Sequence, residues 1–339
     1  MLHQELFKGK VVLITGGTGF LGRQIVRRIL SYEPQSIRLY SRDEVKHFNV
    51  KTEFADHHLL RHLIGDVRDY NRLRKALKGV DIVIHAAALK RIDILEYNVE
   101  ESIQTNIMGT LNVARACWDE NVEKAVFIST DKACSPVNTY GSCKFIGERI
   151  FTESNYNKGN SKTVFTVVRY GNVLDSTGSV IPCFVKNIKN NLPIPLTDER
   201  MTRFLITPNQ AVDLIFNAIR YGVGGEVFIP NLKSFKVTDL IKVLTDQHGN
   251  DPGITVVGIR PGEKIHEILV NDCEARRTYL LQDCFVIKSD IEKHKSEINH
   301  RYLNETSRVD FTELSSKDFL INDQELRLIL EEENLLNKK

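Results

Sequence analysis

A glycine-rich segment lies where an apolar run gives way to a helical pattern. Residues 11–15 are almost wholly apolar, and Gly16-Gly17-Thr18-Gly19-Phe20-Leu21-Gly22 follows them directly. A continuous apolar run is typical of a parallel strand buried on both faces, so strand, tight turn and helix are predicted. Gly16 permits the turn, Gly19 lets a pyrophosphate approach the backbone, and Gly22 lets the helix pack closely. The segment therefore predicts a dinucleotide site, with the free N–H groups of the helix start facing phosphate.

Further strands and helices alternate through the first half of the chain. Strands are predicted at residues 37–40, 58–64, 80–85, 125–129 and 163–169, and helices at 22–30, 70–77, 102–120 and 141–155. This alternation predicts an α/β fold with a Rossmann-like, doubly wound parallel sheet. Right-handed crossovers place the ligand at the carboxyl ends of the strands.

The end of the second strand carries the information on cofactor type. Arg42 there favours the 2′-phosphate of NADP, whereas an acidic residue would favour NAD. Asp43 is adjacent to Arg42, so NAD stays open as the less favoured cofactor. A second alternative is that Arg42 is an ordinary surface charge with no part in cofactor binding. Asp66, after the third strand, is a candidate acceptor for the adenine amino group or an N-cap of the next helix. The predicted cofactor contacts are Gly16, Thr18, Gly19, Phe20, Leu21, Gly22, Ser41, Arg42, Asp43, Lys46, Asp66, Val67, Ala86, Ala87, Lys90, Ile128, Ser129, Tyr140 and Lys144.

The second half is less regular. Helices are predicted at 182–190, 208–221, 237–244 and 324–336, and strands at 226–230 and 255–259. We expect an NADP-binding Rossmann domain over residues 1–172. Residues 173–339 are expected to form a smaller substrate-binding lobe with a C-terminal tail, with some interleaving of elements.

Two pairs of chemically active residues follow the fifth predicted strand. Tyr140 and Lys144 are four residues apart, so a helix puts both on one face, where the ammonium would lower the tyrosine pKa. Asp131 and Lys132 add an acid and a base at the strand tip. This set suits a sugar oxidation coupled to an elimination; the alternative is that Asp131 caps the next segment and pairs with Lys132 as an ordinary ion pair.

The arrangement Thr130, Tyr140 and Lys144 resembles the extended short-chain dehydrogenase/reductase superfamily. More specific segments resemble the UDP-N-acetylglucosamine 4,6-dehydratases, over roughly residues 1–270, and especially the C5-inverting type of the pseudaminic acid pathway, which serves polysaccharide biosynthesis. These segments are Ser129-Thr130-Asp131-Lys132-Ala133, Arg169-Tyr170-Gly171-Asn172-Val173, Gly178-Ser179-Val180-Ile181-Pro182, Thr197-Asp198, Met201-Thr202-Arg203-Phe204 and Gly258-Ile259-Arg260-Pro261-Gly262-Glu263-Lys264. The chain departs from the family at Thr177, where an arginine is common.

The resemblance implies a lyase that oxidises C4, eliminates water across C5 and C6, and returns hydride to C6. Tyr140, with Lys144 and Thr130, would take the 4-OH proton. Lys132, with a lowered pKa, would deprotonate C5, and Asp131, with a raised pKa, would protonate the departing 6-OH. The implied substrate contacts are Lys90, Asn172, Ser176, Thr177, Val180, Thr197, Met201, Arg260 and Glu263.

Three alternatives stay open: a retaining dehydratase, a nucleotide-sugar C4-epimerase, and a non-catalytic NADP-binding regulatory protein. The epimerase needs no acid/base pair for C5 and C6, and the regulator needs neither Tyr140 nor Lys144. Asp131-Lys132 and Tyr140-Lys144 therefore favour the dehydratase.

The charge and composition of the chain argue against several other classes of protein. A formal charge of +2 and 27% charged residues give no reason to expect nucleic-acid binding. No apolar run is long enough to span a bilayer, and the six cysteines form no Cys-x-x-Cys pair, so free thiols and a cytoplasmic location are expected. The ten histidines show no metal spacing, and no metal is predicted. The family implies a homo-oligomer, either a dimer or a hexamer.

Overall fold

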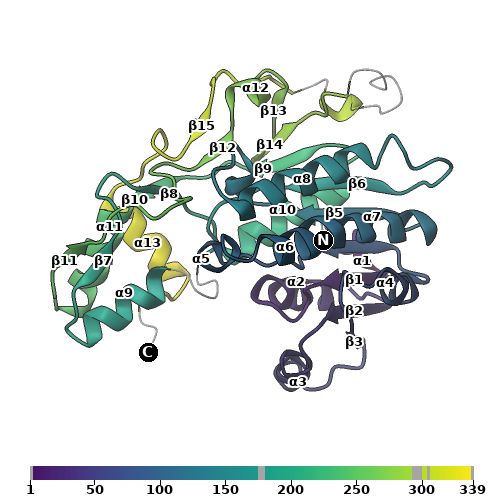
Figure 1. The fold of residues 1–339 in the computed structure, drawn as a ribbon, viewed down its shortest axis with the longest axis horizontal. Helices are drawn as coiled ribbons and strands as arrows, with labels where there is room; N and C mark the ends of the chain where they lie inside the picture. Colours follow the sequence, from purple (N-terminus) through teal and green to yellow (C-terminus); the bar gives the residue numbers. More distant parts are fainter. Residues whose placement is uncertain (1–2, 175–179, 292–299, 304–305, 337–339) are drawn as a thin grey trace.

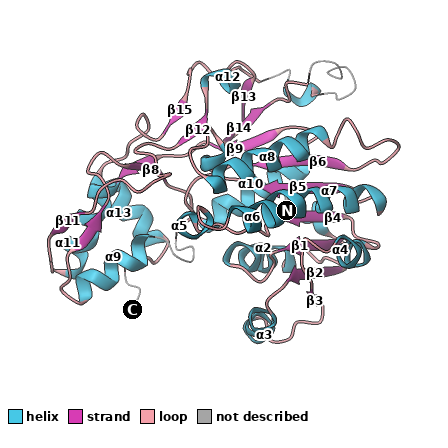
Figure 2. Ribbon diagram, viewed as in Figure 1, coloured by secondary structure: helices cyan, strands magenta, loops and turns pink. Residues whose placement is uncertain are grey.

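The structure, a computed structural model, describes residues 3–174, 180–291, 300–303 and 306–336. Figure 1 shows a large body built around one sheet, with a smaller lobe beside it that carries α9, α11 and α13. Figure 2 shows that helices cover the sheet and that most strands lie in the large body. No helix among the described residues is long and apolar enough to cross a bilayer.

Within the described residues, the central sheet has nine strands in the order β13-β14-β9-β6-β5-β4-β1-β2-β3. The seven strands from β9 to β3 are parallel, and β14 and β13 extend the sheet antiparallel. All five residues of β1 are buried, as a strand covered on both faces requires. The predicted doubly wound parallel sheet is confirmed. The strands are β1 (Val11–Thr15), β2 (Ser36–Ser41), β3 (Leu60–Ile64), β4 (Ile82–His85), β5 (Lys124–Ile128), β6 (Val164–Val168), β7 (Ile194–Leu196), β8 (Thr202–Phe204), β9 (Val227–Pro230), β10 (Ser234–Lys236), β11 (Ile254–Val256), β12 (Ile268–Val270), β13 (Thr278–Leu281), β14 (Cys284–Ile287) and β15 (Leu314–Ser315).

Helices pack on the two faces of the sheet. On one face α7 lies between α4 and α8, while α10 packs beside α2 on the other. The α-helices are α1 (Gln4–Phe7), α2 (Phe20–Leu30), α3 (Glu44–Glu53), α4 (Tyr70–Leu77), α5 (Ile92–Leu95), α6 (Val99–Ser102), α7 (Gly109–Asp119), α8 (Thr139–Glu153), α9 (Val180–Lys189), α10 (Pro208–Tyr221), α11 (Val237–His248), α12 (Asp272–Ala275) and α13 (Asp323–Glu332). A π-helical segment spans Ile103–Met108, and short 3₁₀ turns span Asp131–Ala133 and Arg301–Leu303.

Two helical predictions need correction. The helix α3 was not predicted; Asp43 starts it by accepting a hydrogen bond from the Lys46 backbone, and its weakly amphipathic sequence gave no periodic signal. The single helix predicted at 102–120 is instead α6, the π segment and α7 in succession, because wider turns interrupt the α-helical hydrogen bonding.

The second half contributes to both parts of the molecule. Strands β9, β14 and β13 from this half join the central sheet, alongside the strands of the first half. The smaller lobe has its own apolar core, formed by buried side chains such as Ile188, Leu196, Leu244 and Leu330. A domain boundary after residue 172 stays a prediction.

Candidate active site

The loop between β1 and α2 is shaped by its glycines. Gly16 has a φ of +68°, and a Cβ there would lie 2.9 Å from the Ala87 nitrogen and 3.0 Å from the Ala86 carbonyl carbon. A Cβ on Gly22 would lie 2.4 Å from the Gly17 oxygen. The loop therefore lies against the end of β4 with no room for a side chain at Gly16. Gly19 is the N-cap of α2 and makes no side-chain hydrogen bond there. This close-packed cradle beside a helix start fits a dinucleotide pyrophosphate.

Thr18 and Ser41 join this loop to the end of β2. Their hydroxyl oxygens lie 2.8 Å apart, and Ser41 Oγ is 3.0 Å from His47 Nε2 on α3. Phe20 and Leu21, which open α2, are partly exposed beside the loop. The two carboxyl strand ends are thus held together at the predicted cofactor site.

The charged groups after β2 and β3 are arranged so that basic side chains face solvent. Asp43 is engaged as the N-cap of α3, and Lys46 Nζ lies 3.4 Å from its carboxylate. Arg42 is about half exposed and only 3.4 Å from Asp66 Oδ2. Asp66 does not cap α4, because Asp69 does.

Asp66 instead accepts hydrogen bonds from the Arg68 backbone N and Nε, each at 2.9 Å. Burial alone would raise the pKa of Asp66, but these Arg68 contacts hold it below its ordinary value. Val67, beside it, is buried, and a Cβ on Gly109 would come within 2.6 Å of its side chain. Asp66 is therefore an ionised acceptor at the carboxyl end of β3.

Hydrogen bonds to Thr15 and to Asn106 hold the segment that follows β4. The backbone N–H groups of Ala86 and Ala87 donate to the Thr15 carbonyl oxygen and hydroxyl. Leu89 and Asn106 exchange a reciprocal pair of hydrogen bonds at 2.8 and 2.9 Å. Lys90 follows directly and has an exposed side chain.

The end of β5 carries a buried acid beside a partly buried amine. Ile128 and Ser129 are buried, and Thr130 caps the short 3₁₀ turn Asp131–Ala133. Thr130 Oγ1 donates to Asp131 Oδ1 at 2.8 Å, and Lys132 Nζ donates to the same oxygen at 3.0 Å. The other carboxyl oxygen, Oδ2, is buried without a hydrogen-bond partner among the described residues and faces Gly171.

Helix α8 brings Tyr140 and Lys144 to this turn. A Cβ on Gly141 would lie 2.2 Å from the Lys132 carbonyl oxygen, so only glycine allows the helix start to pack so closely. The Tyr140 phenol lies beside the Thr130 hydroxyl, which favours the ionised phenol. Lys144 Nζ donates to the Ile128 carbonyl oxygen at 2.8 Å and lies 4.4 Å from the centre of the Phe127 ring.

The ionisation of these groups differs from expectation in two cases. Burial raises the pKa of Tyr140 to about 12, and burial lowers the pKa of Lys144 to about 7, so the predicted lowering of the tyrosine pKa is wrong for this state. The predicted lowering of the Lys132 pKa is also wrong, because two neighbouring carboxylates outweigh burial and raise it. The pKa of Asp131 is raised by burial, as predicted.

The second of those carboxylates belongs to Glu267, which sequence reasoning missed. Glu267 Oε1 lies 3.2 Å from Lys132 Nζ and 3.9 Å from Arg203 Nε. Glu267 lies three residues beyond the recognised segment that ends at Lys264, and no spacing rule links it to Lys132. Only the fold brings these residues together.

The loop that contains Arg260 and Glu263 reaches the start of α8. Asn138 Nδ2 donates to the Gly262 carbonyl oxygen at 2.7 Å, and Lys264 Nζ donates to the Cys134 carbonyl oxygen at 2.6 Å. Arg260 is largely exposed, 3.8 Å from Glu263. Because it is exposed, this guanidinium is accessible to a diphosphate.

The remaining predicted substrate residues are spread more widely. Asn172 is exposed and directly follows Gly171, whereas Met201 is buried and its sulfur accepts a hydrogen bond from Arg203 Nη2 at 3.4 Å. Val180 opens α9 and Thr197 follows β7, so both belong to the smaller lobe. Ser176 and Thr177 lie outside the described residues.

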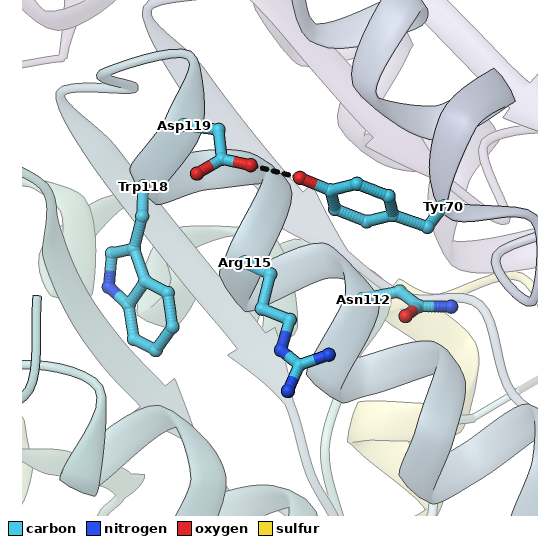
Figure 3. A pocket seen from close by; sticks show the side chains of 5 residues that line it. All are labelled: Tyr70, Asn112, Arg115, Trp118 and Asp119. Atoms are coloured by element: carbon cyan, nitrogen blue, oxygen red, sulfur yellow. Dashed lines mark hydrogen bonds between the residues drawn. The ribbon is translucent and has the colours of Figure 1, made fainter.

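A separate hollow of about 530 Å³ lies between α4 and α7, lined by Tyr70, Asn112, Arg115, Trp118 and Asp119 (Figure 3). In it Tyr70 donates a hydrogen bond to Asp119. None of the residues predicted for the site lines this hollow.

The sheet order, the glycine loop and the Tyr140–Lys144 pair on α8 define an extended short-chain dehydrogenase/reductase protein. Polysaccharide biosynthesis proteins, as a family, match residues 12–289. The UDP-N-acetylglucosamine 4,6-dehydratase (inverting) of Campylobacter jejuni subsp. jejuni serotype O:23/36 (strain 81-176) is 43% identical over 85% of each chain. A UDP-glucose 4-epimerase of Rickettsia bellii (strain RML369-C) is 38% identical over 84% of each chain. The X-ray structure of Pen from Bacillus thuringiensis is 38% identical, with a TM-score of 0.89 over 96% of this chain and 99% of that one.

The chain belongs to the polysaccharide biosynthesis protein family, and its predicted resemblance to the UDP-N-acetylglucosamine 4,6-dehydratases is confirmed.

Proposed function

We propose that the protein is an NADP-dependent UDP-N-acetylglucosamine 4,6-dehydratase that inverts C5 and forms a UDP-4-keto-6-deoxy-N-acetylhexosamine. The observation that carries this proposal is the Asp131–Lys132 pair, 3.0 Å apart at the end of β5, with Tyr140 beside it. A 4-keto sugar made beside this pair would meet a group to take the C5 proton and an acid to protonate the 6-OH. The Campylobacter relative carries the name of the same activity.

The cofactor proposal rests on the cradle around Gly16. The loop 16–22, Ser41, Ala86 and Ala87 would hold the dinucleotide, with Arg42 and Lys46 placed to pair with a 2′-phosphate. Bound NADP would supply the hydride acceptor for C4 and the hydride donor for C6. Asp66 would accept a hydrogen bond from the adenine amino group.

The chain's own residues then carry the proton transfers. Tyr140 takes the 4-OH proton, which requires the phenolate; the positive charge of Lys132 favours that form and burial opposes it. Lys144, on the same helix face, would hold the nicotinamide ribose. Asp131, protonated at its unpaired Oδ2, gives its proton to the departing 6-OH. Lys132 removes the C5 proton and returns one to the opposite face.

The substrate would lie between this pair and the loop 260–264. Arg260 binds the diphosphate, Glu263 accepts from the uridine ribose, and Lys90, Asn172, Ser176, Thr177, Val180, Thr197 and Met201 complete the contacts.

A C4-epimerase is the second candidate, because the Rickettsia relative carries that name. An epimerase needs the oxidation at C4 but no proton donor for a C6 hydroxyl. The buried Asp131, with its raised pKa, therefore favours the dehydratase.

One incubation separates these activities. UDP-N-acetylglucosamine in heavy water with the protein should yield a product lighter by one water and carrying deuterium at C5, and proton NMR then reports the C5 configuration. A product that is only the 4-epimer would establish the epimerase. A dehydrated product with retained C5 configuration would establish a retaining dehydratase. Nucleotide binding without any product would indicate a non-catalytic NADP-binding regulatory protein.

We also propose that the protein forms a homo-oligomer. Exposed apolar side chains of Val99, Ile103, Val137 and Ile146 line a groove of about 420 Å³ beside α8. Such a surface supports self-association, and sedimentation velocity would distinguish a monomer from a dimer or hexamer.

A further inference from the structure

Lys132 is held between two carboxyl groups from distant parts of the chain. Its Nζ lies 3.0 Å from Asp131 Oδ1 and 3.2 Å from Glu267 Oε1. The side chains of Asp131 and Glu267 are 1% and 4% exposed, and that of Lys132 is 20% exposed. Lys132 is thus the most exposed side chain of the three.

Glu267 is rigidly placed. Its backbone N–H donates to Ser316 Oγ at 2.9 Å, and the Ser316 N–H donates to the Glu267 carbonyl oxygen at 2.9 Å. It immediately precedes β12, which pairs with β15. Its second carboxyl oxygen, Oε2, is buried without a hydrogen-bond partner among the described residues, although leaving such an atom unpaired is costly. A proton on this oxygen would displace no existing hydrogen bond among the described residues.

The charges around this cluster determine where its protons rest. Arg203 on β8 and Lys264 face Glu267, while Tyr140 on α8 faces Asp131 and Lys132. Burial alone would raise the pKa of Glu267, but Lys132 and Arg203 hold it below its ordinary value, whereas burial raises that of Asp131. The directions of these shifts favour a proton on Asp131, an ammonium on Lys132 and a carboxylate on Glu267.

An ammonium cannot remove a proton from C5, so the resting state requires a proton acceptor for Lys132. We propose that Glu267 is a positioning residue that holds Lys132 in the cleft and takes its proton when C5 is to be deprotonated, an inference that rests on the proposed dehydration.

The step balances in protons and electrons. One N–H bond of Lys132 breaks and an O–H bond forms on Glu267. The free amine takes the C5 proton, the C5–H electron pair becomes the C5–C6 π bond, and the C6–O pair leaves with the oxygen. Asp131 gives that oxygen its proton to form water. The three groups hold two protons before the elimination and two after it.

Glu267→Gln tests this role, because glutamine keeps the shape and the contact with Lys132 but cannot take a proton. In single turnovers near pH 7 we expect elimination and C5 deuterium incorporation to slow on the order of 100-fold. Oxidation at C4, followed by the absorbance of reduced nicotinamide, should change little, so reduced cofactor accumulates. The elimination rate of this variant should rise with pH, because solvent must now deprotonate Lys132, whereas that of the wild-type protein should stay nearly flat.

Glu267→Asp keeps the charge and should show a reduced rate with the flat profile. Glu313→Gln, a glutamate before β15 that pairs with Lys317, is the matched control and should behave as the wild-type protein. Elimination by Glu267→Gln at the wild-type rate, an equal loss at every pH, or a sloped profile for Glu267→Asp would overturn the role of Glu267. If the wild-type protein itself forms no dehydrated product, the proposed function fails instead.

Discussion

The guanidinium of Arg169 pairs with the carboxylate of Glu148 at 2.6 Å, and neither side chain has any exposed surface. Arg169 follows β6 and Glu148 lies on α8, four residues after Lys144. Arg169 also binds Glu274 of α12 at 2.8 Å, and Ser129 donates to Glu148 at 2.6 Å. This buried cluster therefore joins the end of the sheet, the helix that carries Tyr140 and a segment from the C-terminal quarter of the chain.

Arg169→Met should destabilise the protein by about 3 to 5 kcal/mol, because it leaves two buried carboxylates without their cation. Urea denaturation followed by circular dichroism would measure the change. Lys8→Met, which removes an exposed ion pair with Glu33, is the control and should have little effect. A similarly small effect at Arg169 would mean that the cluster is not structural.

Lys132→Met should slow elimination by roughly 10²- to 10⁴-fold, because the methionine cannot accept the C5 proton. Oxidation at C4 should continue. Mixing the variant with UDP-N-acetylglucosamine should leave reduced nicotinamide and no deuterium at C5. Raising the pH should not restore activity, in contrast to Glu267→Gln. Elimination at the full rate would contradict the role of Lys132.

The Tyr140→Phe variant should be blocked at C4 oxidation, the step before elimination. Without the phenol, the 4-OH proton has no acceptor, so oxidation should fall by roughly 10²- to 10⁴-fold and little reduced nicotinamide should form. Stopped-flow absorbance would measure this, with nucleotide titration to show that binding survives. Normal oxidation by this variant would remove Tyr140 from the mechanism.

Lys144 should make stability depend on pH. Its pKa falls from 10.5 to about 7 on burial, so between these values the unfolded chain holds a proton that the folded chain does not. Stability should therefore rise with pH through this window. Without added nucleotide, Lys144→Met should be more stable than the wild-type protein at pH 7, by on the order of 4 kcal/mol, and the gap should narrow towards pH 10. Urea denaturation at several pH values checks this, and a gap that widens with pH would refute it.

Arg42→Ala should weaken NADP binding by about tenfold to a hundredfold and leave NAD binding nearly unchanged, because only NADP has the 2′-phosphate. Isothermal titration calorimetry with both nucleotides measures the two affinities. Lys51→Ala, at the far end of α3, is the matched control. Equal losses for both nucleotides would show that Arg42 does not read the phosphate.

Much of the fold could be predicted because the signals are local. The apolar run of β1, the glycines 16, 19 and 22, and the amphipathic pattern of α10 each lie within one short segment. The strands β13 and β14 were not predicted. They pair with each other across a short turn, but they join the sheet only because β14 pairs with β9, which ends 54 positions earlier in the chain.

The sequence by itself determined the doubly wound sheet, the position of the glycine loop and the nearness of Asp131, Lys132, Tyr140 and Lys144, since neighbours along a strand end and a helix stay neighbours in space. The tertiary structure alone decided the protonation of that set. Burial at the end of β5 raises the pKa of Asp131. The pKa of Lys132 is raised by Asp131 and by Glu267, which the fold brings from 135 positions further along the chain. Ionisation depends on solvent access and on the charges that the whole fold brings near, and a linear pattern of residues specifies neither.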